Sequence, residues 1–69
     1  MYYFIEITTT EQGVAKAITE KNDLNSANMQ LHQTFASAMA NDDVSACLCI
    51  IINDKGAVQR YEYWEREAS

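Results

Sequence analysis

The chain has 69 residues, of which 48% are hydrophobic, and it contains no proline. A chain so rich in core material and so short is expected to fold as a single domain spanning residues 1–69. Its formal net charge of −5 at pH 7 repels phosphate backbones and anionic headgroups, so we expect neither direct nucleic-acid binding nor membrane docking.

A strand is predicted over residues 2–10, where most side chains are aromatic or β-branched. Residues 11–13 end in Gly13, which supplies the positive φ that a tight turn needs, so a hairpin is expected there. The return strand, residues 14–20, alternates larger side chains with alanines. A helical turn is the alternative for this segment, because the alanines weaken the strand pattern.

The apolar period changes after residue 23. Leu31 and its apolar neighbours recur every three or four positions, which predicts an amphipathic helix from about residue 25 to residue 40. Asn25 or Asp23 is expected to cap its first turn. Asn41 is expected to close it in the left-handed conformation.

Residues 45–53 contain an unbroken apolar run, which is typical of a strand in the middle of a sheet. A second turn, residues 54–56, ends in Gly56 and leads into a partly exposed strand over residues 57–65. The strand order 2-1-3-4 makes every neighbouring pair antiparallel. The predicted fold is therefore α+β: a ββαββ chain whose four-stranded antiparallel sheet carries one helix on one face.

Cys47 and Cys49 are two positions apart, so on a strand they share a face without the geometry to bond to each other. Free thiols suit a reducing compartment. The chain shows neither a basic leader nor an apolar run of the roughly 18 residues that a membrane helix needs. We therefore expect a cytoplasmic protein.

The sequence predicts no catalytic or metal-binding constellation. A structural zinc ion needs four ligands, and the two cysteines have only His32, the single histidine, to join them. No nucleophile is placed beside His32 by sequence, and the acidic pair Asp42-Asp43 has no supporting motif. The cysteines are expected to be small buried hydrophobes. We thus expect a non-enzymatic protein without metal or cofactor.

The last predicted strand is rich in aromatic residues. Tyr61, Tyr63 and Trp64 follow Arg60, and these residue types concentrate binding energy at protein interfaces. The set is predicted to form a recognition strand. The alternative is that Trp64 packs in the core while both tyrosines cover the other face of an edge strand.

Both parities of the first and third strands are apolar, but one helix covers only one face of a sheet. Phe4 and Ile51 are assigned to the face away from the helix, as interface candidates, while Leu31 and Ile50 are assigned to the core. A second copy of the chain is expected to bury this second face or the aromatic edge, giving a dimer or higher oligomer. A docked foreign protein is the alternative.

Residues 31–41, together with Gly56-Ala57-Val58 and Glu62-Tyr63-Trp64, resemble short uncharacterised proteins of bacterial phages and mobile elements. The resemblance spans most of the chain but implies no activity and no functional residue. It does imply host-directed work, such as interference with a defence system, because small acidic proteins of such elements often act by binding.

Two functions compete on these observations. The first is a non-enzymatic interaction module, an inhibitor of a host protein whose acidic surface competes for a basic groove. The second is a homo-oligomer that binds or sequesters a small nucleotide-like ligand at a subunit interface. In that case Tyr61, Tyr63 and Trp64 would stack on the ligand and Arg60 would supply a positive group.

Overall fold

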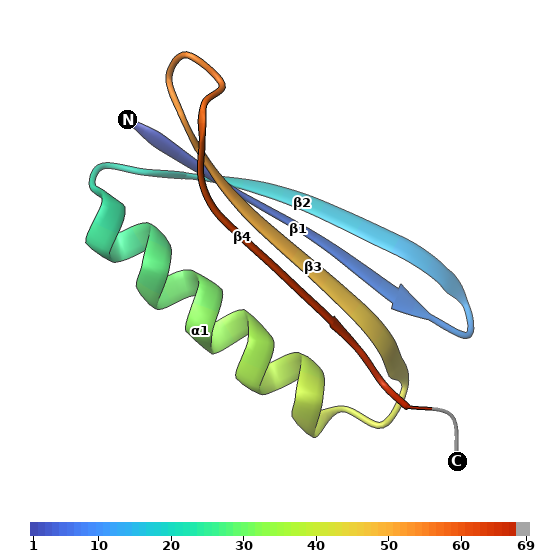
Figure 1. The fold of residues 1–69 in the computed structure, drawn as a ribbon. Coiled ribbons are helices and arrows are strands. Elements are labelled where there is room, and N and C mark those ends of the chain that lie inside the picture. Colours follow the sequence, from blue (N-terminus) through green and yellow to red (C-terminus); the bar gives the residue numbers. More distant parts are fainter. Residues whose placement is uncertain (68–69) are drawn as a thin grey trace.

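The computed structural model describes residues 1–67, which form one sheet and one helix (Figure 1). The elements in chain order are β1 (Tyr2–Thr10), β2 (Gly13–Lys21), α1 (Leu24–Ala40), β3 (Val44–Asn53) and β4 (Val58–Glu65). The sheet order is β2-β1-β3-β4, and every neighbouring pair is antiparallel. The predicted α+β fold with its ββαββ order is confirmed, and the segment 14–20 is a strand.

Both hairpin turns contain a glycine with positive φ, as predicted. Gly13 has φ +131° and Gly56 has φ +83°, conformations that other residues rarely adopt. In the second turn the side-chain oxygen of Asn53 accepts hydrogen bonds from the backbone N–H groups of Lys55 (2.9 Å) and Ala57 (3.0 Å). This asparagine therefore fixes the path of the chain from β3 into β4.

Helix α1 begins at the cap formed by Asp23, whose side chain accepts a hydrogen bond from the Ser26 backbone N–H at 2.7 Å. That bond lowers the pKa of the Asp23 carboxyl, because it favours the charged form. Of the two caps proposed from the sequence, Asp23 is the one used. Asn25 lies inside the first turn of the helix.

The end of α1 differs from the prediction. Asn41 has φ −99° and is not left-handed. Its N–H donates to the Ala38 carbonyl at 3.3 Å, and its carbonyl accepts from the Val44 N–H at 3.0 Å. The Asn41 side-chain oxygen also accepts from the Asp43 N–H at 3.0 Å. The chain is thus turned directly into β3 by consecutive tight turns, and a left-handed closing residue is not needed.

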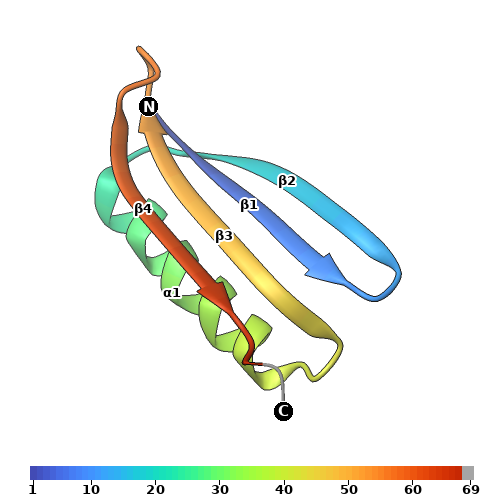
Figure 2. The same ribbon diagram turned by 45° about the vertical axis from the view of Figure 1, so that its right-hand side comes forward.

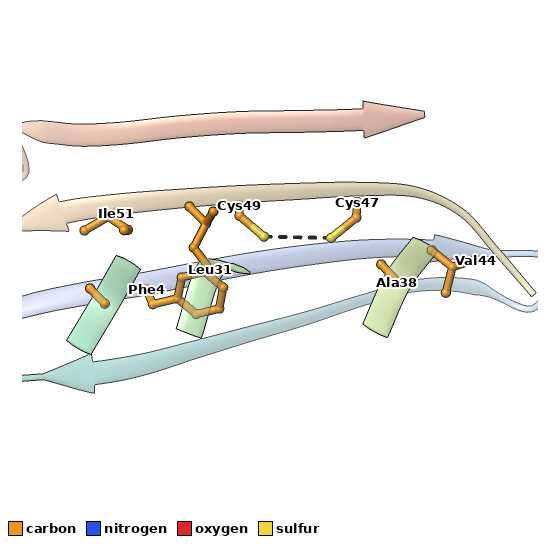
Figure 3. Close-up of a cluster of buried hydrophobic side chains, with 8 residues drawn as sticks. Phe4, Leu31, Ala38, Val44, Cys47, Cys49 and Ile51 are labelled. Atoms are coloured by element: carbon orange, nitrogen blue, oxygen red, sulfur yellow. Dashed lines mark hydrogen bonds between the residues drawn. The ribbon is translucent and has the colours of Figure 1, made fainter. Parts of the chain in front are cut away.

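The core lies between α1 and one face of the sheet (Figure 3). Leu31 is buried as predicted. It belongs to a cluster of eight buried hydrophobic residues, namely Phe4, Ala27, Leu31, Ala38, Val44, Cys47, Cys49 and Ile51. The cluster combines alanines of the helix with cysteines of β3, and small side chains on both sides let the helix approach the sheet closely.

Three assignments of residues to faces are corrected. Phe4 (1% exposed) and Ile51 (0% exposed) lie opposite each other beneath α1, so they do not face away from the helix. Ile50 lies on the other face and is only half-buried. The prediction assigned the two sheet faces the wrong way round because, along β1 and β3, the residues on both faces are apolar. The helix covers the parity that carries the small cysteines.

Candidate protein-binding face

Within residues 1–67, no element covers one face of the sheet. Helix α1 lies on the opposite side, and no described segment crosses in front of the strands (Figures 1 and 2). We call this surface the open face. Its apolar residues alternate with the core residues along β1 and β3, and they continue onto β2 and β4 at the positions that the strand register pairs with them. They are Tyr3, Ile5, Ile7, Val14, Ile18, Leu48, Ile50, Ile52, Val58, Tyr61 and Tyr63.

The strand register arranges the open face in rows that cross all four strands. From β2 to β4 these rows are Glu20–Tyr3–Ile52–Val58, Ile18–Ile5–Ile50–Tyr61 and Lys16–Ile7–Leu48–Tyr63. The middle row is apolar from one edge of the sheet to the other. The charged members of these rows stand only at the β2 edge. Cross-strand neighbours of this kind form a continuous apolar surface.

The open face is exposed most at its two edges. Ile18 is 69% exposed, Val58 is 61% exposed and Tyr61 is 59% exposed. Side chains of β1 and β3 are half-buried by their neighbours within the sheet. Large contiguous apolar patches on the surface of a folded chain mark interaction surfaces.

The two tyrosines of β4 lie on the open face. Tyr63 donates a hydrogen bond from its hydroxyl to the Glu65 carboxylate at 3.1 Å, and this bond raises the pKa of the Tyr63 hydroxyl. Tyr61 is the more exposed of the two. Both rings offer a large apolar body with a polar tip, the property that enriches tyrosine at interfaces.

Trp64 and Arg60 lie on the helix side of β4. Trp64 is half-buried against the core, and the Arg66 guanidinium lies 4.8 Å from the centroid of its ring. Arg60 donates to the Asn28 side-chain oxygen at 3.0 Å and pairs with Glu62 at 3.5 Å. The sequence candidates therefore separate between two faces. As in the alternative placement, both tyrosines lie on the face away from the helix, and Trp64 packs against the core from the other side but is only half-buried.

An open groove of about 270 Å³ lies between α1 and β4. Its lining includes His32, Phe35, Arg60 and Trp64. This volume is just under the range of roughly 300–1,000 Å³ that is typical of small-molecule sites. Its cation is already engaged by Asn28 and Glu62.

The two cysteines offer no reactive thiol. Both are completely buried, with their sulfur atoms 3.8 Å apart (Figure 3). Burial away from water, reinforced by the neighbouring Cys47, raises the pKa of the Cys49 thiol to about 12. Within residues 1–67, no three His, Cys, Asp or Glu side chains gather as metal ligands would.

Comparison of the chain with protein-family models, curated proteins and solved structures gives no match. Among the residues that the structure describes, the helix falls short of the length and hydrophobicity that crossing a bilayer requires.

Most residues of the open face were not singled out from the sequence as candidates. The usable signal was the alternation in β2, where Val14, Lys16 and Ile18 point to one face and alanines to the other. A second signal was the pair of cysteines in β3, whose small size suits the side on which a helix packs. Read together, they place Ile5 and Ile50 on the uncovered side.

Proposed function

We propose that the chain is a non-enzymatic protein-binding module and that the open face is its contact surface. The observation that carries this proposal is the apolar row Ile18–Ile5–Ile50–Tyr61, which runs uncovered across the whole sheet. When a partner removes such a surface from water, the complex is stabilised by about 25 cal/mol per Å² of apolar area.

The negative net charge of the chain indicates what kind of partner surface it would bind. With a formal net charge of −5, the chain favours a protein whose apolar patch is bordered by basic side chains, because complementary charge speeds encounter and rejects other partners. The resemblance to phage and mobile-element proteins supports a host protein as the target, with inhibition as the outcome. An inhibitor of this kind acts by occupying the partner's groove.

The test is a matched pair of variants. Ile50→Glu places a charge in the middle of the open face, whereas Met29→Glu places the same charge on the exposed surface of α1. Quantitative mass spectrometry of host proteins that co-purify with each variant identifies a partner, and calorimetry with the purified partner measures the affinity. We expect Met29→Glu to bind like wild type and Ile50→Glu to lose at least about tenfold in affinity.

Two results would contradict the proposal. One is a set of captured host proteins that Ile50→Glu leaves unchanged. The other is a purified partner that binds both variants equally. Circular dichroism of both variants checks that the fold is intact, so that loss of binding is not confused with unfolding.

A small nucleotide-like ligand is the second candidate, favoured by the groove that brings Arg60, Trp64 and His32 together. Stacking on the tryptophan and one positive group are the minimum for such a ligand. Tryptophan fluorescence and thermal melts with a panel of nucleotides test it, with Arg60→Ala as the control variant. A melting temperature that no nucleotide changes removes this candidate and leaves the protein-binding proposal untouched.

A further inference from the structure

Strand β2 is a free edge of the sheet and is exposed over residues 13–20. The Thr9 carbonyl of β1 faces β3, where it accepts a hydrogen bond from the Ser45 hydroxyl at 3.2 Å. Backbone groups alternate in direction along an antiparallel strand, so every second residue of β2 turns its own N–H and C=O groups outward. By the β1–β2 register, the outward residues are Val14, Lys16, Ile18 and Glu20.

The side chains of these outward residues are self-complementary. Lys16 and Glu20 stand two positions on either side of Ile18, on the same face of the strand. If a second copy of β2 runs antiparallel to the first about a twofold axis at Ile18, each Lys16 stands opposite the other copy's Glu20. The two Ile18 side chains then stand opposite each other. Opposite charges and paired aliphatic side chains both stabilise cross-strand neighbours.

We propose that two copies of this chain pair edge to edge through β2, in the antiparallel register centred on Ile18. The contact is isologous, because each copy supplies the same lysine and the same glutamate. It continues the sheet from one copy into the other and satisfies the outward backbone groups at the β2 edge. It also joins the two open faces, because the row through Ile18 then runs on into the same row of the second copy.

The surroundings of β2 leave room for a second copy. On the helix side of the strand, the residues nearest the proposed axis are Ala17 and Thr19, which are small and exposed. Helix α1 packs chiefly against the two central strands, β1 and β3, so most of it lies away from the β2 edge. The helices of the two copies therefore do not meet at this contact.

The other edge of the sheet, β4, is less suited to the same pairing. Its oppositely charged side chains, Arg60 and Glu62, already form an ion pair within the strand at 3.5 Å. The β3–β4 register is also irregular between Ile51 and Ile52, which distorts the pairing ladder there. In contrast, Lys16 and Glu20 take part in no ion pair or side-chain hydrogen bond within the described part of the chain.

Charge reversal tests the register directly. Light scattering over a concentration series is expected to show wild type approaching twice its mass of 7.8 kDa. Lys16→Glu and Glu20→Lys each turn both cross-strand attractions into repulsions, and each is expected to raise the dimer dissociation constant at least about tenfold. An equimolar mixture of the two variants restores opposite charges and is expected to recover the dimer. The double variant Lys16→Glu/Glu20→Lys is expected to recover it as well.

Matched controls separate register from general charge effects. Lys55→Glu and Asp42→Lys make the same charge changes at exposed positions outside β2, and they are expected to leave the dissociation constant unchanged. In hydrogen exchange, the amides of Lys16, Ile18 and Glu20 are expected to be protected in concentrated wild type and to exchange freely in Lys16→Glu.

Three results would overturn the proposal. The first is a mass of 7.8 kDa at every concentration. The second is a dimer that neither charge reversal weakens, which would move the contact to the open face or to β4. The third is a pair of weakened variants that do not recover on mixing. Circular dichroism confirms that each variant is folded, and none of these readouts depends on a foreign partner.

Discussion

The Cys49 thiol is unreactive at neutral pH. It is completely buried and its pKa is raised to about 12, so the thiolate that reacts with oxidants or metals is not formed. Its neighbour Cys47 shares the same buried position beneath α1. The pair therefore acts as two small side chains that let the helix lie close to the sheet.

The raised pKa predicts that the protein loses stability in alkali. In the unfolded chain Cys49 loses its proton near its ordinary value of 9.0, whereas in the folded protein it keeps the proton up to about 12. The folded state thus binds more protons in this window, and the free energy of unfolding falls as the pH rises through it. Below pH 9.0 the contribution of this thiol is fully present.

Urea melts at neutral pH and about one unit above the ordinary thiol pKa measure this effect. The Cys49→Ala variant is the control, because it keeps all lysines and tyrosines but lacks the buried thiol. The free energy of unfolding of Cys49→Ala is expected to fall less steeply with rising pH than that of the wild-type protein. Equal slopes for the two proteins would show that the thiol is accessible to solvent.

At the level of elements, the two sheet faces differ in what they contribute to stability. Leu31→Ala removes a buried side chain of α1 and is expected to cost about 2–5 kcal/mol. Ile50→Ala removes a half-buried side chain of the open face and is expected to cost less in the isolated chain. Denaturant melts at low protein concentration measure both. Equal losses would mean that the open face is covered in solution.

The second turn gives a prediction of a different kind. Gly56 has φ +83°, and a Cβ added there meets no atom within 4 Å, so a substitution costs backbone strain alone. Gly56→Val is expected to destabilise by about 1–2 kcal/mol or more, and Gly56→Asn by less, because asparagine tolerates the left-handed region. Thermal melts compare the two variants. If valine is as well tolerated as asparagine, the turn has a different conformation in solution.

The elements could be predicted from the sequence because their signals are local. Turn glycines at positions 13 and 56 mark the hairpins, and the change of apolar period marks the helix. The sequence did not decide between Asn25 and Asp23 as the N-cap of the helix, because both side chains accept hydrogen bonds from backbone N–H groups. The prediction for the end of the helix was wrong because the closing hydrogen bonds involve Val44, which belongs to the next strand.

The faces could not be assigned by the same reasoning. Phe4 and Ile5 are equally suited to a core, and alternation shows only that they point to opposite sides. The choice depends on which side chains the helix fits against, a contact between residues far apart in sequence. The predicted recognition strand was affected by the same error, because its residues were not assigned to the correct faces. Tyr61 and Tyr63 are on the open face, but Trp64 and Arg60 are not.

At the scale of the whole molecule, residues 1–67 form two layers, one sheet and one helix, and no third layer covers the open face of the sheet. Its extents of 39 × 19 × 15 Å describe a slab whose helix side is closed and whose sheet side is not. The proposed partner covers the open face, and the proposed second copy extends it sideways. Ile18 takes part in both contacts, so in the dimer the open faces of the two copies lie next to each other.

The central pairing of β1 with β3 also has a kinetic consequence. Each hairpin, β1–β2 and β3–β4, closes through a short turn, and such hairpins form in about 1–10 μs. By contrast, β1 meets β3 only after β2 and α1 have been looped out between them, which is a slower closure. With no proline in the sequence, no slow peptide-bond isomerisation follows. We therefore expect the docking of two preformed hairpins along β1 and β3, with α1 condensing over the junction, to limit the rate of refolding.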